Sequence, residues 1–178
     1  MSFAQPTSVE DLLNYRLSRL LAASGSMVTL LCEGRYGITR REWRLLCMLA
    51  ERGPLSPSEL SQLAHLERAR ISRHIADLAG KKLVARVAVQ GDGRRARVEL
   101  TDRGRKLHGE LFPQSLKFNQ QLLQVLSAGE LAVFDQALTR LTRAADDISR
   151  SHDLPEKADR RHGGSRRVNI AEPGGGPW

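Results

Sequence analysis

The apolar residues between Ile38 and Thr101 change their spacing once, and this change constrains the fold more than any other feature of the sequence. Over three successive segments they recur every three or four positions, which is the spacing of amphipathic helices. From Leu83 onward they form two short β-prone runs on either side of a glycine-containing turn, as in a hairpin. Three helices followed by a hairpin predict a winged helix-turn-helix over residues 38–100, in a chain that is otherwise mainly α-helical.

Capping residues and helix breakers set the limits of these elements. Thr39 is a suitable N-cap for the first of the three helices, and Ser58 is a suitable N-cap for the second. The third is expected to bury Ile71, Ile75 and Leu78 along one side. The expected elements are helices over residues 40–52, 59–65 and 68–81, strands over 83–89 and 97–100, and a basic turn over 90–96.

Long amphipathic helices are expected on both sides of the winged region. The first is capped by Ser8 and ends before Gly34, and two more begin after the caps Thr101 and Ser127. Their apolar faces exceed what one small winged domain can cover, so the chain is predicted to be an obligate homodimer. The domain is expected over residues 8–150, with dimerisation helices over 8–34 and 101–150 and a disordered tail over 151–178.

Positive charge is concentrated in the winged region. Residues 35–106 contain 17 Lys and Arg against 8 Asp and Glu, whereas the rest of the chain contains 11 basic and 12 acidic residues. A localised basic excess is typical of a surface that binds a polyanion, because neutralising phosphates releases their condensed counterions. Together with the helix-turn-helix pattern, it predicts a protein that binds double-stranded DNA.

Other functional classes lack the sequence features that they require. No apolar run reaches 18 residues and the N-terminus is unlike a signal peptide, so we expect a cytoplasmic protein with no membrane association. Cys32 and Cys47 are too few and too far apart for a disulfide framework or a zinc site. The five histidines show no metal-ligand spacing, and no phosphate loop or nucleophile motif is present. We therefore expect no enzyme activity, no cofactor and no metal.

Five segments of the chain match a known family pattern: Ile38–Leu46, Leu60–Ala64, Ile71–Ile75, Asp92–Arg95 and Leu100–Gly104. They resemble the MarR family of bacterial winged helix-turn-helix transcription regulators, and the resemblance extends over about residues 12–150. Its most specific part is the wing signature Asp-x-Arg followed by Leu-Thr-x-x-Gly. Lys82 departs from the family pattern, which has a glycine there. A left-handed residue other than glycine costs about 1 kcal/mol, so we expect an altered helix end.

The helix expected over residues 68–81 would be the recognition helix. Such a helix presents hydrogen-bond donors near its N-terminal end, and arginine can form two hydrogen bonds with guanine. The candidates for DNA contact are Arg68, Arg70, Ser72, Arg73 and His74. The resemblance implies that Ser72 and Arg73 face the major groove. As an alternative, an arginine here is solvated or paired with Glu67 or Asp77.

In the wing, glycines flank a turn that contains Asp92, Arg94 and Arg95. A narrow minor groove attracts such arginines because its electrostatic potential is strongly negative. The resemblance implies that Asp92 orients Arg94 in the minor groove of a pseudo-palindromic operator. The alternative is an ordinary charged hairpin tip.

The resemblance also implies regulation by a small effector, often aromatic and anionic, in a cleft between the dimerisation helices and the winged domain. An apolar wall with a few polar groups is what such a site needs. The candidate ligand-binding residues are Tyr15, Arg19, Ser24, Trp43 and Cys47. Each of them has an alternative role in packing or on the surface. We therefore expect a repressor that a ligand releases from its operator. The alternatives are a regulator that senses oxidants through a thiol, and a constitutive architectural DNA-binding protein.

Overall fold

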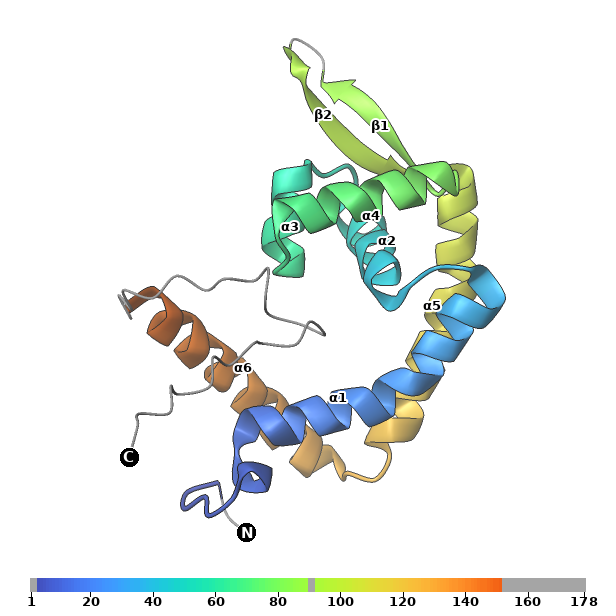
Figure 1. The fold of residues 1–178 in the computed structure, drawn as a ribbon. Helices are drawn as coiled ribbons and strands as arrows, with labels where there is room; N and C mark the ends of the chain where they lie inside the picture. The colour runs from blue at the N-terminus through green and yellow to red at the C-terminus, as the bar shows by residue number, and fades with distance from the viewer. Residues whose placement is uncertain (1–2, 90–91, 152–178) are drawn as a thin grey trace, which may run out of the picture. The chain divides into compact units, whose positions relative to one another are not determined.

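The computed structural model describes residues 3–89 and 92–151, with the backbone alone for residues 89 and 92–95. Its elements in chain order are η1 (Val9–Asp11), α1 (Leu13–Leu30), η2 (Leu31–Arg35), α2 (Arg40–Arg52), α3 (Pro57–Ala64), α4 (Arg68–Gly80), β1 (Val84–Val89), β2 (Asp92–Leu100), α5 (Asp102–Leu123) and α6 (Ala128–Ser151). The helices α2, α3 and α4 with the antiparallel hairpin β1–β2 form the predicted winged helix-turn-helix (Figure 1). The tail after residue 151 lies outside the described residues.

The chain divides into two compact units, the first ending at Val125 and the second beginning at Leu126. The second unit contains α6. The Ser127 hydroxyl accepts a hydrogen bond from the Glu130 N–H at 3.3 Å, and the Glu130 carboxylate accepts one from the Ser127 N–H at 2.8 Å. This confirms the predicted capping box. Over the described residues, no helix combines the length and the hydropathy that a membrane span needs.

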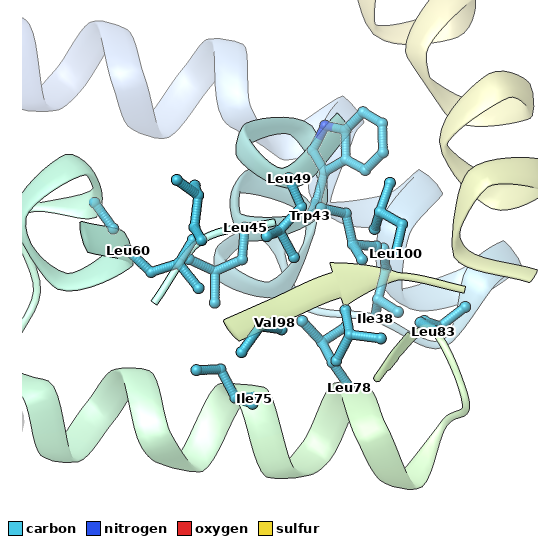
Figure 2. Packing of buried hydrophobic residues seen from close by; sticks show 14 of the residues in the cluster. Ile38, Trp43, Leu45, Leu49, Leu60, Ile75, Leu78, Leu83, Val98 and Leu100 are labelled. Atoms are coloured by element: carbon cyan, nitrogen blue, oxygen red, sulfur yellow. The ribbon is translucent and has the colours of Figure 1, made fainter. Parts of the chain in front are cut away.

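The core of the first unit lies between the three helices of the winged region and the strand β2. Figure 2 shows Ile75 and Leu78 of α4 and Val98 of β2 among the side chains of this core. Ile71, Ile75 and Leu78 are at most 1% exposed, so the predicted buried face of α4 is confirmed. A bridge between Leu55 and Val98, with N···O distances of 3.0 and 2.7 Å, holds β2 against the loop before α3.

Capping boxes fix the starts of α2 and α3. The Thr39 hydroxyl accepts a hydrogen bond from the Glu42 N–H at 3.2 Å, and the Glu42 carboxylate accepts one from the Thr39 N–H at 2.6 Å. The predicted cap of α2 is therefore confirmed. In α3 the cap is Ser56 rather than Ser58, so the predicted start was wrong by two residues. Pro57 explains this, because proline lacks an N–H and its fixed φ suits the first helical position.

The N-terminal helix differs from the prediction at both ends. The Asp11 carboxylate accepts four hydrogen bonds from Thr7 and Ser8 at 3.0–3.2 Å, and Ser8 therefore starts only the short turn η1. At the other end, the helical backbone continues as the π-turn η2 through Gly34, where an end was expected. A glycine within a helix costs only about 1 kcal/mol, so packing can override it. Gly37, with a φ of 62°, lies where the chain leaves the helix.

The hairpin is longer than predicted. Val84 pairs with Leu100 and Val87 with Arg97, and the register shifts after Ala88. β2 begins at Asp92, so the turn predicted over residues 90–96 was too long. The charged run here lacks an alternating apolar pattern. Backbone hydrogen bonds form the ladder of an antiparallel pair, so the strand continues without that pattern.

The turn after α4 adopts a left-handed conformation at Lys82 although this residue is not glycine, so the expected change of the helix end is not seen in the backbone. Lys82 has a φ of 59°, and the Leu83 N–H donates to the Leu78 carbonyl at 2.9 Å. The Thr101 hydroxyl donates to the Lys82 carbonyl at 2.7 Å and accepts from the Gly104 N–H at 3.0 Å. The Leu-Thr-x-x-Gly motif therefore joins the start of α5 to the end of α4.

Replacing Gly104 with alanine is expected to destabilise the protein. A Cβ at this position would lie 2.1 Å from the carbonyl oxygen of Leu83, so the start of α5 must move. We expect a loss of about 1–3 kcal/mol in urea unfolding, as at other overpacked sites. Gly109→Ala in the same helix is the control, because nothing lies within 4 Å of the added Cβ. Equal stability of the two variants would contradict this account.

Candidate DNA-binding surface and ligand cavity

Most of the predicted recognition residues lie on the exposed surface of α4. The exposed ones are Arg68, Arg70, Ser72 and Arg73. Arg73 is two residues away from both Ile71 and Ile75, and at about 100° per residue this places it opposite the buried face. His74 is half-buried beside that face. The helix therefore presents three arginines and a serine to a partner.

The structure shows no ion pair between these arginines and an acidic side chain of residues 3–89 or 92–151. In the part of the chain that the structure describes, Arg68, Arg70 and Arg73 form no ion pair and no side-chain hydrogen bond. Asp77 lies one helical turn after Arg73 and does not pair with it. Unpaired surface cations are available to phosphates and to base edges. The alternative of intramolecular pairing is thus not supported for these side chains.

At the base of the wing, β2 contacts the rest of the winged region through Arg97. Arg97 donates a hydrogen bond to the Pro54 carbonyl at 3.1 Å and lies 3.7 Å from the Glu59 carboxylate. These contacts join β2 to the loop before α3 and to α3 itself. The predicted minor-groove residues Asp92, Arg94 and Arg95 belong to β2, and their side chains lie outside the described part of the structure.

An ion pair between a buried carboxylate and a partly exposed lysine connects α4 to α2. Glu42 is 2% exposed, and its two carboxylate oxygens lie 2.8 and 2.9 Å from the Lys81 Nζ. Burial raises the pKa of Glu42, but hydrogen bonds from Lys81 and Thr39 outweigh burial and hold the pKa below its ordinary value of 4.5. The carboxylate is therefore ionised at neutral pH. The pair fastens the C-terminal end of α4 to the first turn of α2.

The helices α1, α2 and α5 line a cavity of about 620 Å³. Of the five predicted ligand residues, Ser24, Trp43 and Cys47 line this cavity. Tyr15 and Arg19 do not, because they lie closer to the start of α1 than the turns that face it. The lining residues that the sequence did not single out include Arg40, Ser115, Phe118 and Asn119. Three of these come from α5, whose contact with α1 and α2 no local pattern reveals.

Arg40 brings a cation without a counter-charge to the cavity. Its guanidinium covers Gly25 of α1, where an added Cβ would lie 2.0 Å from Nη1. Within the described ranges Arg40 forms no ion pair and no side-chain hydrogen bond. The Ser115 hydroxyl on the same cavity is buried and also has no hydrogen-bond partner there. A cation and a hydroxyl left unpaired in this way can each bind a polar group of a ligand.

Trp43 supplies an aromatic wall that packing holds in place. The His108 ring stacks between Trp43 and Phe112, with centroids 5.4 and 5.1 Å away. Burial lowers the pKa of His108, so the ring is neutral at pH 7. This aromatic stack joins α2 to α5 beside the cavity.

Neither cysteine has the surroundings of a reactive thiol. Burial raises the pKa of Cys32 to about 11 and that of Cys47 to about 12. A redox-sensing cysteine needs an accessible thiolate, and both thiols remain protonated at neutral pH. The alternative of a thiol-based switch therefore has no support from this geometry.

Comparison with known proteins identifies related regulators. A family model described as the MarR family matches residues 36–95. An uncharacterized helix-turn-helix transcriptional regulator from Bacillus subtilis, YxaD, is 31% identical over 116 residues, covering 65% of this chain and 81% of YxaD. The transcriptional repressor NicR from Pseudomonas putida is 30% identical over 93 residues, covering 52% of this chain and 59% of NicR.

A solved structure shows the same fold. The PcaV transcriptional regulator from Streptomyces coelicolor, crystallised with its natural ligand, aligns with a TM-score of 0.66 and 26% identity. The alignment covers 79% of this chain and 99% of PcaV.

Proposed function

The chain belongs to the MarR family of transcriptional regulators, and we propose that it is a homodimeric repressor that an aromatic acid releases from a pseudo-palindromic operator. The observation that carries the DNA-binding part is the exposed face of α4, whose arginines form no ion pair with any residue that the structure describes. The repressor NicR and the ligand complex of PcaV support the regulatory part. A bacterial regulator of this kind acts in the cytoplasm, where its operator is. We propose no catalytic activity for it.

The homodimer follows from apolar surface that a monomer leaves in water. Leu20, Leu21 and Leu30 of α1 and Leu141 and Ile148 of α6 are each at least 44% exposed. Burying a leucine or isoleucine contributes about 1.5–3 kcal/mol, so a second copy of the chain would gain much from covering these faces. A two-fold dimer places two recognition helices on half-sites about one DNA turn apart, which predicts a pseudo-palindrome.

The cavity supports an aromatic carboxylate as the effector. A guanidinium without a counter-charge pairs well with a planar carboxylate through two parallel hydrogen bonds, so we assign this role to Arg40. Trp43 would contact the aromatic ring, and the Ser115 hydroxyl would bond a polar ring substituent. An architectural DNA-binding protein would have no use for such a site, so the cavity favours a regulator.

Selection of binding sites from random DNA tests the DNA-binding part. We expect the full-length protein to enrich an inverted repeat with half-sites about one helical turn apart. Retention of DNA with no common sequence would favour the architectural alternative.

Replacing Arg40 with glutamine tests the effector part. Calorimetric titration with benzoate and 4-hydroxybenzoate should show binding, whereas benzamide, which has no charge, should bind weakly. A hydrogen bond to a charged group contributes about 1.5–3 kcal/mol, so Arg40→Gln should weaken carboxylate binding by at least about tenfold. Arg41→Gln is the control, because Arg41 is exposed, adjacent in sequence and absent from the cavity wall. Equal losses in both variants, or equal binding of the amide, would contradict this assignment.

A further inference from the structure

The exposed face of α4 holds one arginine between two alanines. Ala69, Arg73 and Ala76 are all exposed. They are four and three residues apart, and residues at these spacings are neighbours along one side of a helix. The buried residues Ile71 and Ile75 lie on the opposite side. We call these three residues the Ala69–Arg73–Ala76 row.

The arginine and the two alanines of the row are suited to two different bases. The Arg73 guanidinium has no partner among the described residues. Two of its N–H groups can therefore donate one hydrogen bond each to O6 and N7 of guanine. Alanine carries no donor or acceptor, and its methyl group makes an apolar contact with the C5-methyl of thymine. Because the two alanines are small, they also let the helix approach the floor of the groove.

The length of the row sets the length of the sequence that it reads. Ala76 follows Ala69 by seven positions, which is about 10 Å along the helix axis. This distance corresponds to about three base-pair steps of 3.4 Å. Arg70 and Ser72 lie to either side of the row and are placed to meet phosphates or neighbouring bases.

We propose that Arg73 reads a guanine in each operator half-site and that Ala69 and Ala76 read thymine methyl groups on either side of it, within two base pairs. This specificity rests on the proposed function, because it requires α4 to enter the major groove of a specific site.

Base analogues in the selected operator test the proposal atom by atom. Replacing the central guanine by 7-deazaguanine removes the N7 acceptor and should weaken binding of the wild-type protein by at least about fivefold. The same replacement should leave the affinity of Arg73→Ala unchanged, because that variant has already lost the contact. Replacing the flanking thymines by uracil removes only their methyl groups and should weaken wild-type binding by about threefold per methyl.

Matched variants separate the methyl contact from helix stability. Ala76→Gly and Ala69→Gly should lose the sensitivity to uracil, whereas Ala79→Gly should keep it. Ala79 is exposed on the same helix but lies outside the row, so its replacement carries the same propensity cost. Binding is measured by fluorescence anisotropy at one salt concentration, with the melting temperature of each variant recorded.

The possible outcomes distinguish this proposal from the proposed function. The guanine contact of Arg73 is overturned if the selected inverted repeat lacks the guanine, or if the wild type and Arg73→Ala are equally sensitive to 7-deazaguanine. Either result leaves the proposed function as a regulator standing. Uracil sensitivity that persists in both glycine variants overturns the role of the alanines. Selection that yields no common sequence overturns the proposed function and this proposal together.

Discussion

Replacing Leu141 with glutamate is expected to dissociate the proposed homodimer into monomers. The apolar residues of α6 recur at alternating intervals of three and four, the pattern of a helix that packs lengthwise on another helix. They are Leu131, Phe134, Leu138, Leu141, Ala145 and Ile148. Leu141 lies within this stripe and is 44% exposed, and no residue of α6 is buried. An unpaired carboxylate at a buried interface costs about 3 kcal/mol or more, which raises the dimer Kd at least about a hundredfold.

Sedimentation velocity over a range of protein concentrations measures this effect. Thr139→Glu is the control, because Thr139 is exposed on the same helix outside the stripe. Leu141→Glu should also reduce affinity for the full operator toward the affinity for one half-site. A dimer of wild-type strength in Leu141→Glu, or a wild-type protein that is monomeric at micromolar concentration, would show that α6 is not the interface.

Replacing Lys81 with methionine is expected to be among the most destabilising changes in the winged region. Glu42 would keep its burial and lose the cation that bonds both of its carboxylate oxygens. Removing the partner of a buried carboxylate leaves its charge uncompensated. We expect a cost of about 1–3 kcal/mol, because the Lys81 side chain is 37% exposed and water can partly replace it. Lys82→Met is the control, because Lys82 is exposed and its side chain forms no ion pair over the described residues. Urea unfolding at pH 7 provides the measurement.

The pH dependence of the same variants gives an independent readout. In the folded wild type the pKa of Glu42 is held below its ordinary value of 4.5. The ionised Glu42 therefore stabilises the folded state above pH 4.5, and this stabilisation is lost as the pH falls through the folded pKa. In Lys81→Met the hydrogen bond from the Thr39 N–H to Glu42 remains, but the hydrogen bonds and the positive charge of Lys81 are lost. The pKa of Glu42 is therefore higher than in the wild type, and acidification neutralises the unpaired charge. The stability difference between wild type and variant should therefore shrink as the pH falls below about 5. A difference that stays constant from pH 7 to pH 4 would show that Lys81 stabilises the fold through packing and not through charge.

The local pattern of the sequence was sufficient to predict the type and order of most helices and strands. The buried face of α4 and the caps at Thr39 and Ser127 depend on residues only three or four positions apart, and the structure confirms them. The start of α3 was open to the same kind of reasoning, since Pro57 marks it more strongly than Ser58 does. The limits of the wing were harder to place, because a charged strand carries no apolar alternation.

The sequence by itself determined that the chain forms a winged helix-turn-helix with a basic recognition helix, because helical periodicity, caps and charge are properties of neighbouring residues. Only the tertiary structure decided which distant groups meet. It placed Arg40 over Gly25 at a cavity shared with α5, and it joined Glu42 to Lys81 across 39 positions. Such pairs depend on how helices pack, and an exposed arginine and one that lines a cavity have the same local sequence signal. The candidate ligand site was therefore only partly predictable, whereas the exposed arginines of α4 were predictable from the periodicity of that helix alone.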